Sequence, residues 1–284
     1  MKNQISYVIP TDRYHPVQLK VFFTMITLYT FYFTANYNLS TATKYMQDEF
    51  HLSNSEFGIL FTIFTLGFGL GQFAAGFLGD RYNPKLLMLI GAIGAATANL
   101  CFAASNSMTA FAVFWGINSV SLSLGWSPGC SILFRWIPRK RWGLFMGFFD
   151  AFAFLGGIVV YPVAGFAITY FSWRAVFIIP PILLIAWSVL FFFVVKSTPE
   201  EKGLTVEWAD SEAKEKATLK DYGSILKNPV INLICVAAIC SQFVRWGLVN
   251  WMIKILVEKP EMGGYGIALV TATIIASFMH WGGA

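Results

Sequence analysis

Arg245 has the clearest capacity for chemistry, because it is a cation inside a long apolar run, residues 229–253. A charged side chain at the centre of a bilayer costs about 3 kcal/mol on insertion scales unless it faces a cavity or a partner. The guanidinium presents a planar fork of N–H donors, which suits a phosphate or a carboxylate. We therefore predict that Arg245 anchors an anion. The alternative is a structural arginine that pairs with another helix.

Uncharged polar and aromatic residues within the apolar runs form a second group of candidates. Amide, hydroxyl and indole groups make the hydrogen bonds that a hydroxylated solute needs. The predicted substrate-binding residues beside Arg245 are Asn36, Tyr37, Gln72, Trp126 and Asn250. Polar residues in membrane helices also hold helices together, so a binding role and a packing role both stay open for each of them.

Asp150 lies near the start of the apolar run 143–169, about 10 Å along a helix. Its carboxyl group is a candidate for coupling, because burial favours the protonated form and makes the group a proton carrier. The alternative is a partner for Arg139 or Arg141 at the rim of the membrane.

No residues have the spacing of a metal or catalytic site. The three histidines are scattered at the ends of apolar runs, and no glycine loop followed by lysine is present to hold a phosphate. The cysteines fall in apolar runs, which favours reduced packing residues: they are Cys101, Cys130, Cys235 and Cys240. We predict no cofactor, no metal and no enzymatic activity.

Membrane-spanning helices must position these side chains. The chain is 56% hydrophobic and 12% charged, with a mean hydropathy of +0.61, which is too apolar for a water-soluble domain. Its apolar runs have the length of about 20 residues that a helical span needs, and the alternating pattern of outer-membrane barrels is missing. The predicted spans are 18–40, 55–79, 86–104, 108–134, 143–169, 174–195 and 229–253, with a weaker one at 265–281. The predicted fold class is an all-α polytopic membrane protein.

A charged segment, residues 196–228, divides the spans into two groups. We predict a six-helix bundle at 1–195, a solvated linker at 196–228 with a short surface helix at 207–221, and the start of a second bundle at 229–284. Fifteen of the 20 Lys and Arg residues fall on the side of the N-terminus and the linker, which predicts that this side is cytoplasmic. The basic residues occupy short loops rather than one face, so we expect a lipid bilayer and no nucleic acid as partner.

The loop after the second span has the sequence Gly76-Phe-Leu-Gly-Asp80-Arg81-Tyr-Asn83-Pro84-Lys85. It resembles the cytoplasmic loop motif of the major facilitator superfamily. The resemblance implies a cytoplasmic gate formed by Gly76, Asp80, Arg81, Asn83 and Lys85. The alternative is an ordinary basic loop between two helices.

Three further segments resemble the organophosphate:phosphate antiporter branch of that superfamily. They are Gly125-Trp126-Ser-Pro128 with the arginine loop after it, Ser172-Trp173-Arg174-Ala-Val-Phe177, and Ser197-Thr198-Pro199-Glu-Glu-Lys-Gly203-Leu204. The context of Arg245 is similar to the seventh-helix segment where this branch places one of two phosphate-binding arginines. The positions of the branch's other arginine, its lysine and its histidine are occupied here by Asn36, Gln72 and Phe152. A dianionic phosphate is stabilised less at such a site.

The resemblance implies the major facilitator fold and secondary active transport by alternating access in the inner membrane. The expected solute is small, polar and anionic, such as a sugar acid or an organophosphate, moved by a monomer with a coupling ion or a counter-anion. An alternative from another class is a membrane sensor that binds a sugar phosphate without transporting it. We expect a complete first bundle and about two helices of the second, which predicts an incomplete chain; a natural eight-helix protein is the alternative.

Overall fold

The computed structural model describes residues 7–9, 15–79, 81–206 and 227–281. The α-helices in these ranges are α1 (Pro16–Thr34), α2 (Asn38–Phe50), α3 (Asn54–Gly79), α4 (Pro84–Ala104), α5 (Met108–Ser123), α6 (Trp126–Trp136), α7 (Trp142–Tyr170), α8 (Ile179–Val194), α10 (Pro229–Val257) and α11 (Leu269–Trp281). Two short strands, β1 (Tyr7–Ile9) and β2 (Leu204–Val206), pair in parallel. Single 3-10 turns lie at Arg139–Arg141, Trp173–Phe177, Glu200–Lys202 and Pro260–Met262. The predicted surface helix at 207–221 lies outside the described residues.

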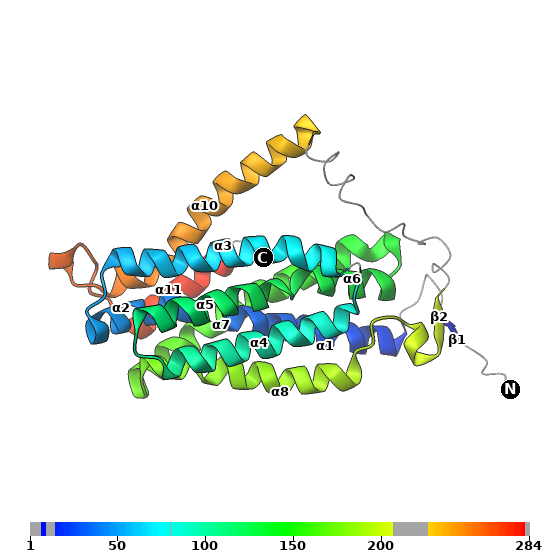
Figure 1. The fold of residues 1–284 in the computed structure, drawn as a ribbon, viewed down its shortest axis with the longest axis horizontal. Coiled ribbons are helices and arrows are strands. Elements are labelled where there is room, and N and C mark those ends of the chain that lie inside the picture. The colour runs from blue at the N-terminus through cyan, green and yellow to red at the C-terminus, as the bar shows by residue number, and fades with distance from the viewer. Residues whose placement is uncertain (1–6, 10–14, 80, 207–226, 282–284) are drawn as a thin grey trace.

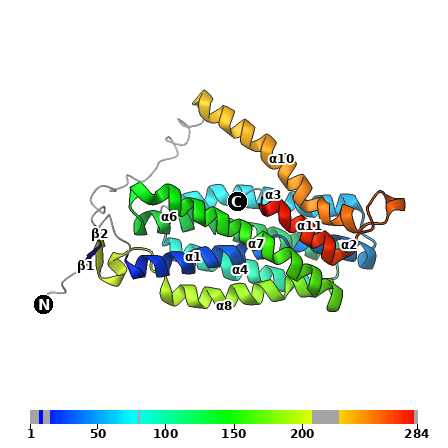
Figure 2. The same ribbon diagram turned by 180° about the vertical axis from the view of Figure 1, so that it is seen from behind.

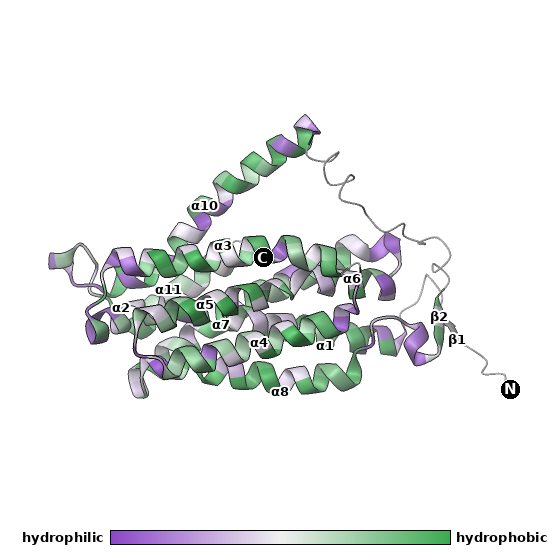
Figure 3. Cartoon of the chain, in the orientation of Figure 1, coloured by the Kyte–Doolittle hydropathy of each residue, from purple (hydrophilic) through white to green (hydrophobic). Residues whose placement is uncertain are grey.

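Helices α1 to α8 run side by side and form the first bundle (Figures 1 and 2). In the described part of the chain, six helical segments are long and apolar enough to cross a membrane, and they match six of the predicted spans. Hydrophobic residues dominate their middle sections, and hydrophilic residues gather toward the ends and connections (Figure 3). Large apolar side chains also point outward, among them Leu70, Phe73 and Phe193 at 70%, 81% and 72% exposure. Lipid is the environment in which such a surface is stable.

The first crossing consists of two helices, whereas the sequence predicted one span at 18–40. Helix α1 ends at Thr34, the chain turns through residues 35–37, and α2 continues to Phe50. The predicted end was wrong because α2 is less apolar, although the polar residues in its first half are buried. The hydroxyl groups of Ser40, Thr41 and Thr43 are buried and donate to backbone carbonyls of the same crossing.

A chain of three asparagine side chains holds this break in place. The Asn38 amide donates to Asn99 Oδ1 at 2.8 Å, and the Asn99 amide donates to Asn118 Oδ1 at 2.9 Å. The Asn118 amide in turn donates to the Ala35 carbonyl at 3.2 Å, inside the break. All three asparagines are fully buried. The network therefore links α2, α4 and α5 and gives partners to groups that lipid could not solvate.

The fourth crossing is also divided, since α5 ends at Ser123 and α6 begins at Trp126 within the predicted span 108–134. Gly125 lies in the break. A Cβ atom there would come within 3.0 Å of the rings of Tyr29 and Tyr32 on α1. The absence of a side chain thus lets the two crossings approach closely.

Small residues also bring α3 and α5 together. A Cβ atom on Gly67 or Gly71 would overlap the hydroxyl groups of Ser119 and Ser123, respectively. Both contacts lie inside the first bundle, so these two glycines pack one bundle rather than line a boundary between two.

Helices α10 and α11 contact the first bundle in different ways. Helix α11 lies along α7, where Gly165 faces the side chain of Thr273 so closely that no Cβ atom would fit. Helix α10 meets the bundle only near its C-terminal end and leans away toward its N-terminus (Figures 1 and 2). Its buried residues, Val249, Ile253 and Lys254, all belong to that last part.

We predict that Asn99→Leu lowers the free energy of unfolding by about 1–2 kcal/mol, because it leaves the amides of Asn38 and Asn118 buried with fewer partners. Chemical denaturation in mixed micelles measures this loss. Asn106→Leu is the matched control, since Asn106 is exposed and accepts one hydrogen bond from Arg174. The control should stay within about 0.5 kcal/mol of the parent protein. Equal stability of the two variants would contradict a stabilising role for the asparagine chain.

Candidate functional site

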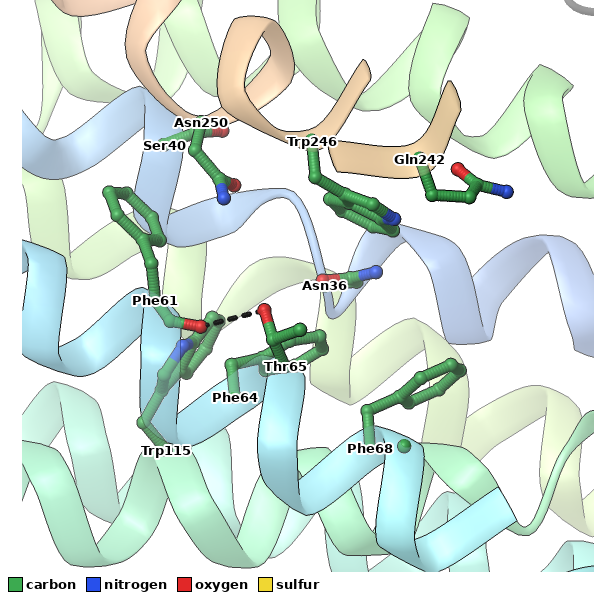
Figure 4. Close-up of a pocket in the computed structure, with 11 residues that line it drawn as sticks. Asn36, Ser40, Phe61, Phe64, Thr65, Phe68, Trp115, Gln242, Trp246 and Asn250 are labelled. Carbon is green, nitrogen blue, oxygen red and sulfur yellow. Dashed lines mark hydrogen bonds between the residues drawn. The ribbon is translucent and has the colours of Figure 1, made fainter. Parts of the chain in front are cut away.

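A cavity of about 220 Å³ lies where α10 faces the first bundle. Its lining residues come from the first crossing, α3, α5 and α10, and they are Asn36, Ser40, Phe61, Phe64, Thr65, Phe68, Gly69, Trp115, Gln242, Trp246 and Asn250. Figure 4 shows the Asn36 side chain at the break of the first crossing, between Trp246 of α10 and the aromatic residues of α3. The cavity is therefore formed jointly by the two parts of the chain.

The cavity combines aromatic walls with uncharged polar groups. Thr65 Oγ1 donates to the Phe61 carbonyl at 2.9 Å, and Ser40 Oγ donates to the Tyr37 carbonyl at 2.9 Å. Both hydroxyl oxygens can still accept a hydrogen bond, and the Asn36 amide can donate or accept. No charged side chain is among the lining residues that the structure describes. Such a surface suits the hydroxyl-bearing part of a solute.

On α10, the cavity residues Gln242, Trp246 and Asn250 recur every fourth position and so share one face of the helix. Arg245 lies on the adjacent face, between the first two of them in sequence. Its guanidinium carbon is 4.5 Å from the centre of the Phe154 ring on α7. This arrangement places the predicted anion anchor beside the cavity and against the first bundle.

Asp150 on α7 interacts electrostatically with Arg245 across the boundary between the first bundle and α10. The side chain of Asp150 is exposed, and Arg245 is half-buried. The charge of Arg245 thus acts on Asp150 at this boundary, and both the coupling role of Asp150 and its pairing with Arg139 or Arg141 stay predictions.

The other predicted binding residues occupy different depths. Asn36 and Asn250 line the cavity. Tyr37 is buried behind it, with its ring centre 6.3 Å from that of Trp246. Gln72 is half-buried on α3, one helical turn beyond the lining residue Phe68. Trp126 stacks on Phe149 at 5.1 Å and does not line the cavity.

Sequence reasoning missed several lining residues. Trp115, Phe64 and Trp246 look like ordinary aromatic residues of apolar runs, and no pattern in the sequence separates them from lipid-facing ones. Gln242 carried a usable signal, because it is a polar residue in an apolar run one turn from Arg245.

The predicted gate motif surrounds the α3–α4 connection. Asn83 caps α4 by accepting from the Lys85 backbone N–H at 3.0 Å, and it also accepts from the Ser197 hydroxyl at 2.6 Å. Lys85 is buried and donates to the Phe192 carbonyl at 2.6 Å. Arg81 is exposed and lies 3.6 Å from the centre of the Phe77 ring.

The other two members of the predicted gate motif are Gly76 and Asp80. Gly76 packs near Ser127 of α6, with room for a Cβ atom at 3.9 Å from the Ser127 hydroxyl. Asp80 lies outside the described residues.

A buried lysine joins α10 to the first bundle near the α10–α11 connection. Lys254 is 5% exposed, and its amino group donates to Asn54 Oδ1 at the start of α3. Glu258, one turn further along α10, lies 3.6 Å from the same amino group. The charge of Lys254 is thus compensated by Glu258, and its hydrogen bond to Asn54 joins α10 to α3.

The comparisons with known proteins settle the family. Residues 25–284 match the Major Facilitator Superfamily. The chain belongs to this superfamily. It is therefore a multi-pass membrane protein, and the match agrees with the predicted fold class.

Characterised relatives confirm the predicted branch. The chain is 23% identical to a probable hexose phosphate transport protein of Chlamydia trachomatis, over 94% of this chain and 62% of the relative. It is 26% identical to the glycerol-3-phosphate transporter of Bacillus subtilis, over 86% of this chain and 59% of the relative. It is 27% identical to the membrane sensor protein UhpC of Escherichia coli, over 89% and 59%. The chain thus spans about three fifths of the length of these relatives.

The fold is shared with solved structures as well. A bacterial homolog of the human lysosomal transporter Spinster, in an inward-facing and unoccupied conformation, superposes with a TM-score of 0.78 at 16% identity, over 94% of this chain and 60% of that one. The predicted major facilitator fold is confirmed: the first bundle holds six crossings, and α10 and α11 correspond to the first two helices of the second bundle.

We predict that Lys254→Met weakens the contact between α10 and α3, because it removes the hydrogen bond to Asn54 and leaves the Glu258 carboxylate without its cation. The reporter is a Ser40→Cys variant that lacks the native cysteines, so that its one thiol lies in the cavity. In the Lys254→Met variant this thiol should react faster than in the protein with Lys254, when an impermeant thiol reagent is applied from the side of the α10–α11 connection. The increase should be on the order of tenfold.

Lys259→Met is the control for this experiment. Lys259 is exposed, follows Glu258 in sequence and carries the same charge. Identical labelling rates in the Lys254 and Lys259 variants would show that the buried lysine does not close this end of the cavity.

Proposed function

We propose that the protein is a secondary active transporter that moves a small hydroxylated organic anion by alternating access. The observation that carries this proposal is the position of the cavity. Its walls come from both the first bundle and α10, so movement of one part against the other changes the side from which the cavity is reached. The membership of the superfamily and the names of the characterised relatives support the same conclusion.

The solute class follows from the distribution of charge around the cavity. Uncharged amides and hydroxyls line it, and the cation Arg245 lies at its edge. A solute with several hydroxyl groups and a single anionic group fits this division, as a sugar acid or an organophosphate does. Asn36 occupies the place where the branch carries a second arginine, which favours a carboxylate or a monoanionic phosphate over a dianion.

Asp150 supplies a physical basis for coupling. While the solute is absent, its carboxylate interacts with Arg245; an incoming anion competes for the same guanidinium. Protonation of Asp150, or exchange of one anion for another, removes the competition. The proposed location is the inner membrane. The N-terminus and the linker face the cytoplasm in the proposed orientation, because most Lys and Arg residues lie on the side of the N-terminus and the linker.

A sensor is the second candidate, because the chain is similar to the membrane sensor protein UhpC. Ligand-dependent thermal stabilisation and radiolabelled uptake separate the two functions. Phosphate esters, sugar acids and neutral sugars are compared first for binding, since a ligand of the native state raises its stability by mass action. A transporter accumulates the stabilising solute in proteoliposomes, whereas a sensor binds it without accumulation.

We predict that Arg245→Lys weakens binding of an anionic solute by about tenfold while binding of a neutral sugar changes little. The substitution keeps the positive charge but loses the planar fork of donors. Thermal shifts over a concentration series for each solute measure the two affinities. An equal loss for both solutes would assign Arg245 to the structure of α10 instead.

We predict that Asp150→Asn abolishes gradient-driven accumulation of the solute but leaves exchange of solute across the membrane, because the amide cannot take up and release a proton. Affinity for the anion should rise, since a competing carboxylate beside Arg245 is removed. Accumulation and counterflow in the same proteoliposomes give both quantities. Asp48→Asn, in the exposed pair with Lys44, is the matched control. Full accumulation by the Asp150 variant would exclude the coupling role.

A further inference from the structure

Lysine residues from distant parts of the chain converge on one buried indole. Trp136, at the end of α6, is 1% exposed. Its carbonyl accepts from the Gln18 amide at 2.6 Å, two residues before Lys20, and its indole N–H donates to the Lys196 carbonyl at 2.9 Å. The amino group of Lys202 lies 6.0 Å from the centre of the Trp136 ring. Three lysine-bearing segments thus contact a single residue, one through its backbone carbonyl and two through its indole.

A fourth lysine joins them through the α3–α4 connection. The Ser197 hydroxyl donates to Asn83 Oδ1 at 2.6 Å, which ties the residue after Lys196 to the residue two positions before Lys85. The amino group of Lys85 lies 4.5 Å from the centre of the Phe192 ring on α8. We call Lys20, Lys85, Lys196 and Lys202 the lysine cluster.

The lysine cluster carries four positive charges, and none of its members takes part in an ion pair among the described residues, where the ion pairs involve Lys44, Arg174 and Lys254. The carboxylate of Glu201 is near enough to act on Lys85, but it is a single negative charge. Burial and the positive charges of the other three members lower the pKa of Lys202. Like charges in a partly desolvated place repel one another, so an anion that bridges them is stabilised there.

Apolar surface begins directly beside the cluster. Phe192 and Phe193, near the end of α8, are 50% and 72% exposed, and Phe23, one turn from Lys20 on α1, is 53% exposed. A groove of about 410 Å³ lies between α1 and α7, and its lining is almost wholly apolar; it includes Leu19, the neighbour of Lys20 in sequence, together with Phe22, Phe23 and Phe148. Cations next to an apolar groove match a molecule with an anionic head and hydrocarbon chains.

We propose that Lys20, Lys196 and Lys202 of the lysine cluster bind the phosphate of an anionic phospholipid headgroup, with the buried Lys85 adding positive charge beside them, and that an acyl chain of the same lipid lies in the groove between α1 and α7. This site is separate from the cavity at α10, and the proposal does not depend on transport. A phosphodiester offers two oxygens to ammonium groups that have no carboxylate partner in the described structure, and the lipid's hydrocarbon continues along a surface that lipid already covers.

Nanodiscs of phosphatidylglycerol and of phosphatidylcholine provide the test, with thermal unfolding as the readout. The parent protein should be more stable in phosphatidylglycerol by about 3 °C. The double variant Lys196→Gln/Lys202→Gln should lose most of that difference while its midpoint in phosphatidylcholine stays unchanged. Lys140→Gln/Lys259→Gln removes the same charge from exposed positions outside the cluster and should retain the full difference.

Two results would overturn the proposal. Retention of the full phosphatidylglycerol effect by the cluster variant shows that the stabilisation has another origin. Inorganic phosphate that stabilises the parent protein equally well in phosphatidylcholine shows that the cluster takes a free anion and not a lipid. If the double variant is unstable in both lipids, the single variants Lys20→Gln and Lys202→Gln are compared by native mass spectrometry, where fewer retained phosphatidylglycerol molecules support the site and equal numbers reject it.

Discussion

The hydrogen-bonded chain of Asn38, Asn99 and Asn118 is the interaction on which the site depends. A break in a membrane-spanning helix exposes backbone carbonyls that lipid cannot solvate, and here the Ala35 carbonyl receives the Asn118 amide. Because the break is stabilised, Asn36 can turn its side chain into the cavity while the chain still crosses the membrane. The same polar chain holds α4 and α5 against the first crossing, so the geometry of the cavity wall and the packing of the bundle have one origin.

Much of the fold could be predicted from apolar length alone, since a bilayer requires spans of a minimum length and loops must return to water. The spans that became α3, α4, α7, α8 and α10 were placed within a few residues of their ends. The prediction failed at the first crossing, because hydropathy cannot distinguish a polar residue facing water from one bonded to its own helix, as in α2. Breaks inside crossings depend on side-chain partners far away in sequence, and a local pattern does not contain them.

The candidate site, like the fold, could be predicted from the sequence only in part. The cavity-lining residues Asn36 and Asn250 could be selected from the sequence because polar groups in a bilayer need a partner or a cavity. Trp115 and Trp246 could not, since aromatic residues are common on lipid-facing, packing and cavity surfaces alike. Arg245 and Phe154 lie about ninety positions apart in sequence, and only the fold brings the guanidinium to 4.5 Å from the ring centre. Charged residues in apolar runs can be selected as candidates from the sequence, whereas the contacts between them depend on the fold.

The parallel pairing of β1 with β2 has a consequence for biogenesis. Tyr7 pairs with Leu204, so β1 acquires its neighbour only after roughly 200 further residues have been made. At synthesis rates of about 5–20 residues per second, this takes on the order of 10–40 s. All the crossings of the first bundle are made in that interval. The small sheet therefore closes only after the helices of the first bundle have been made, so its pairing joins the segments before and after that bundle once all the crossings exist.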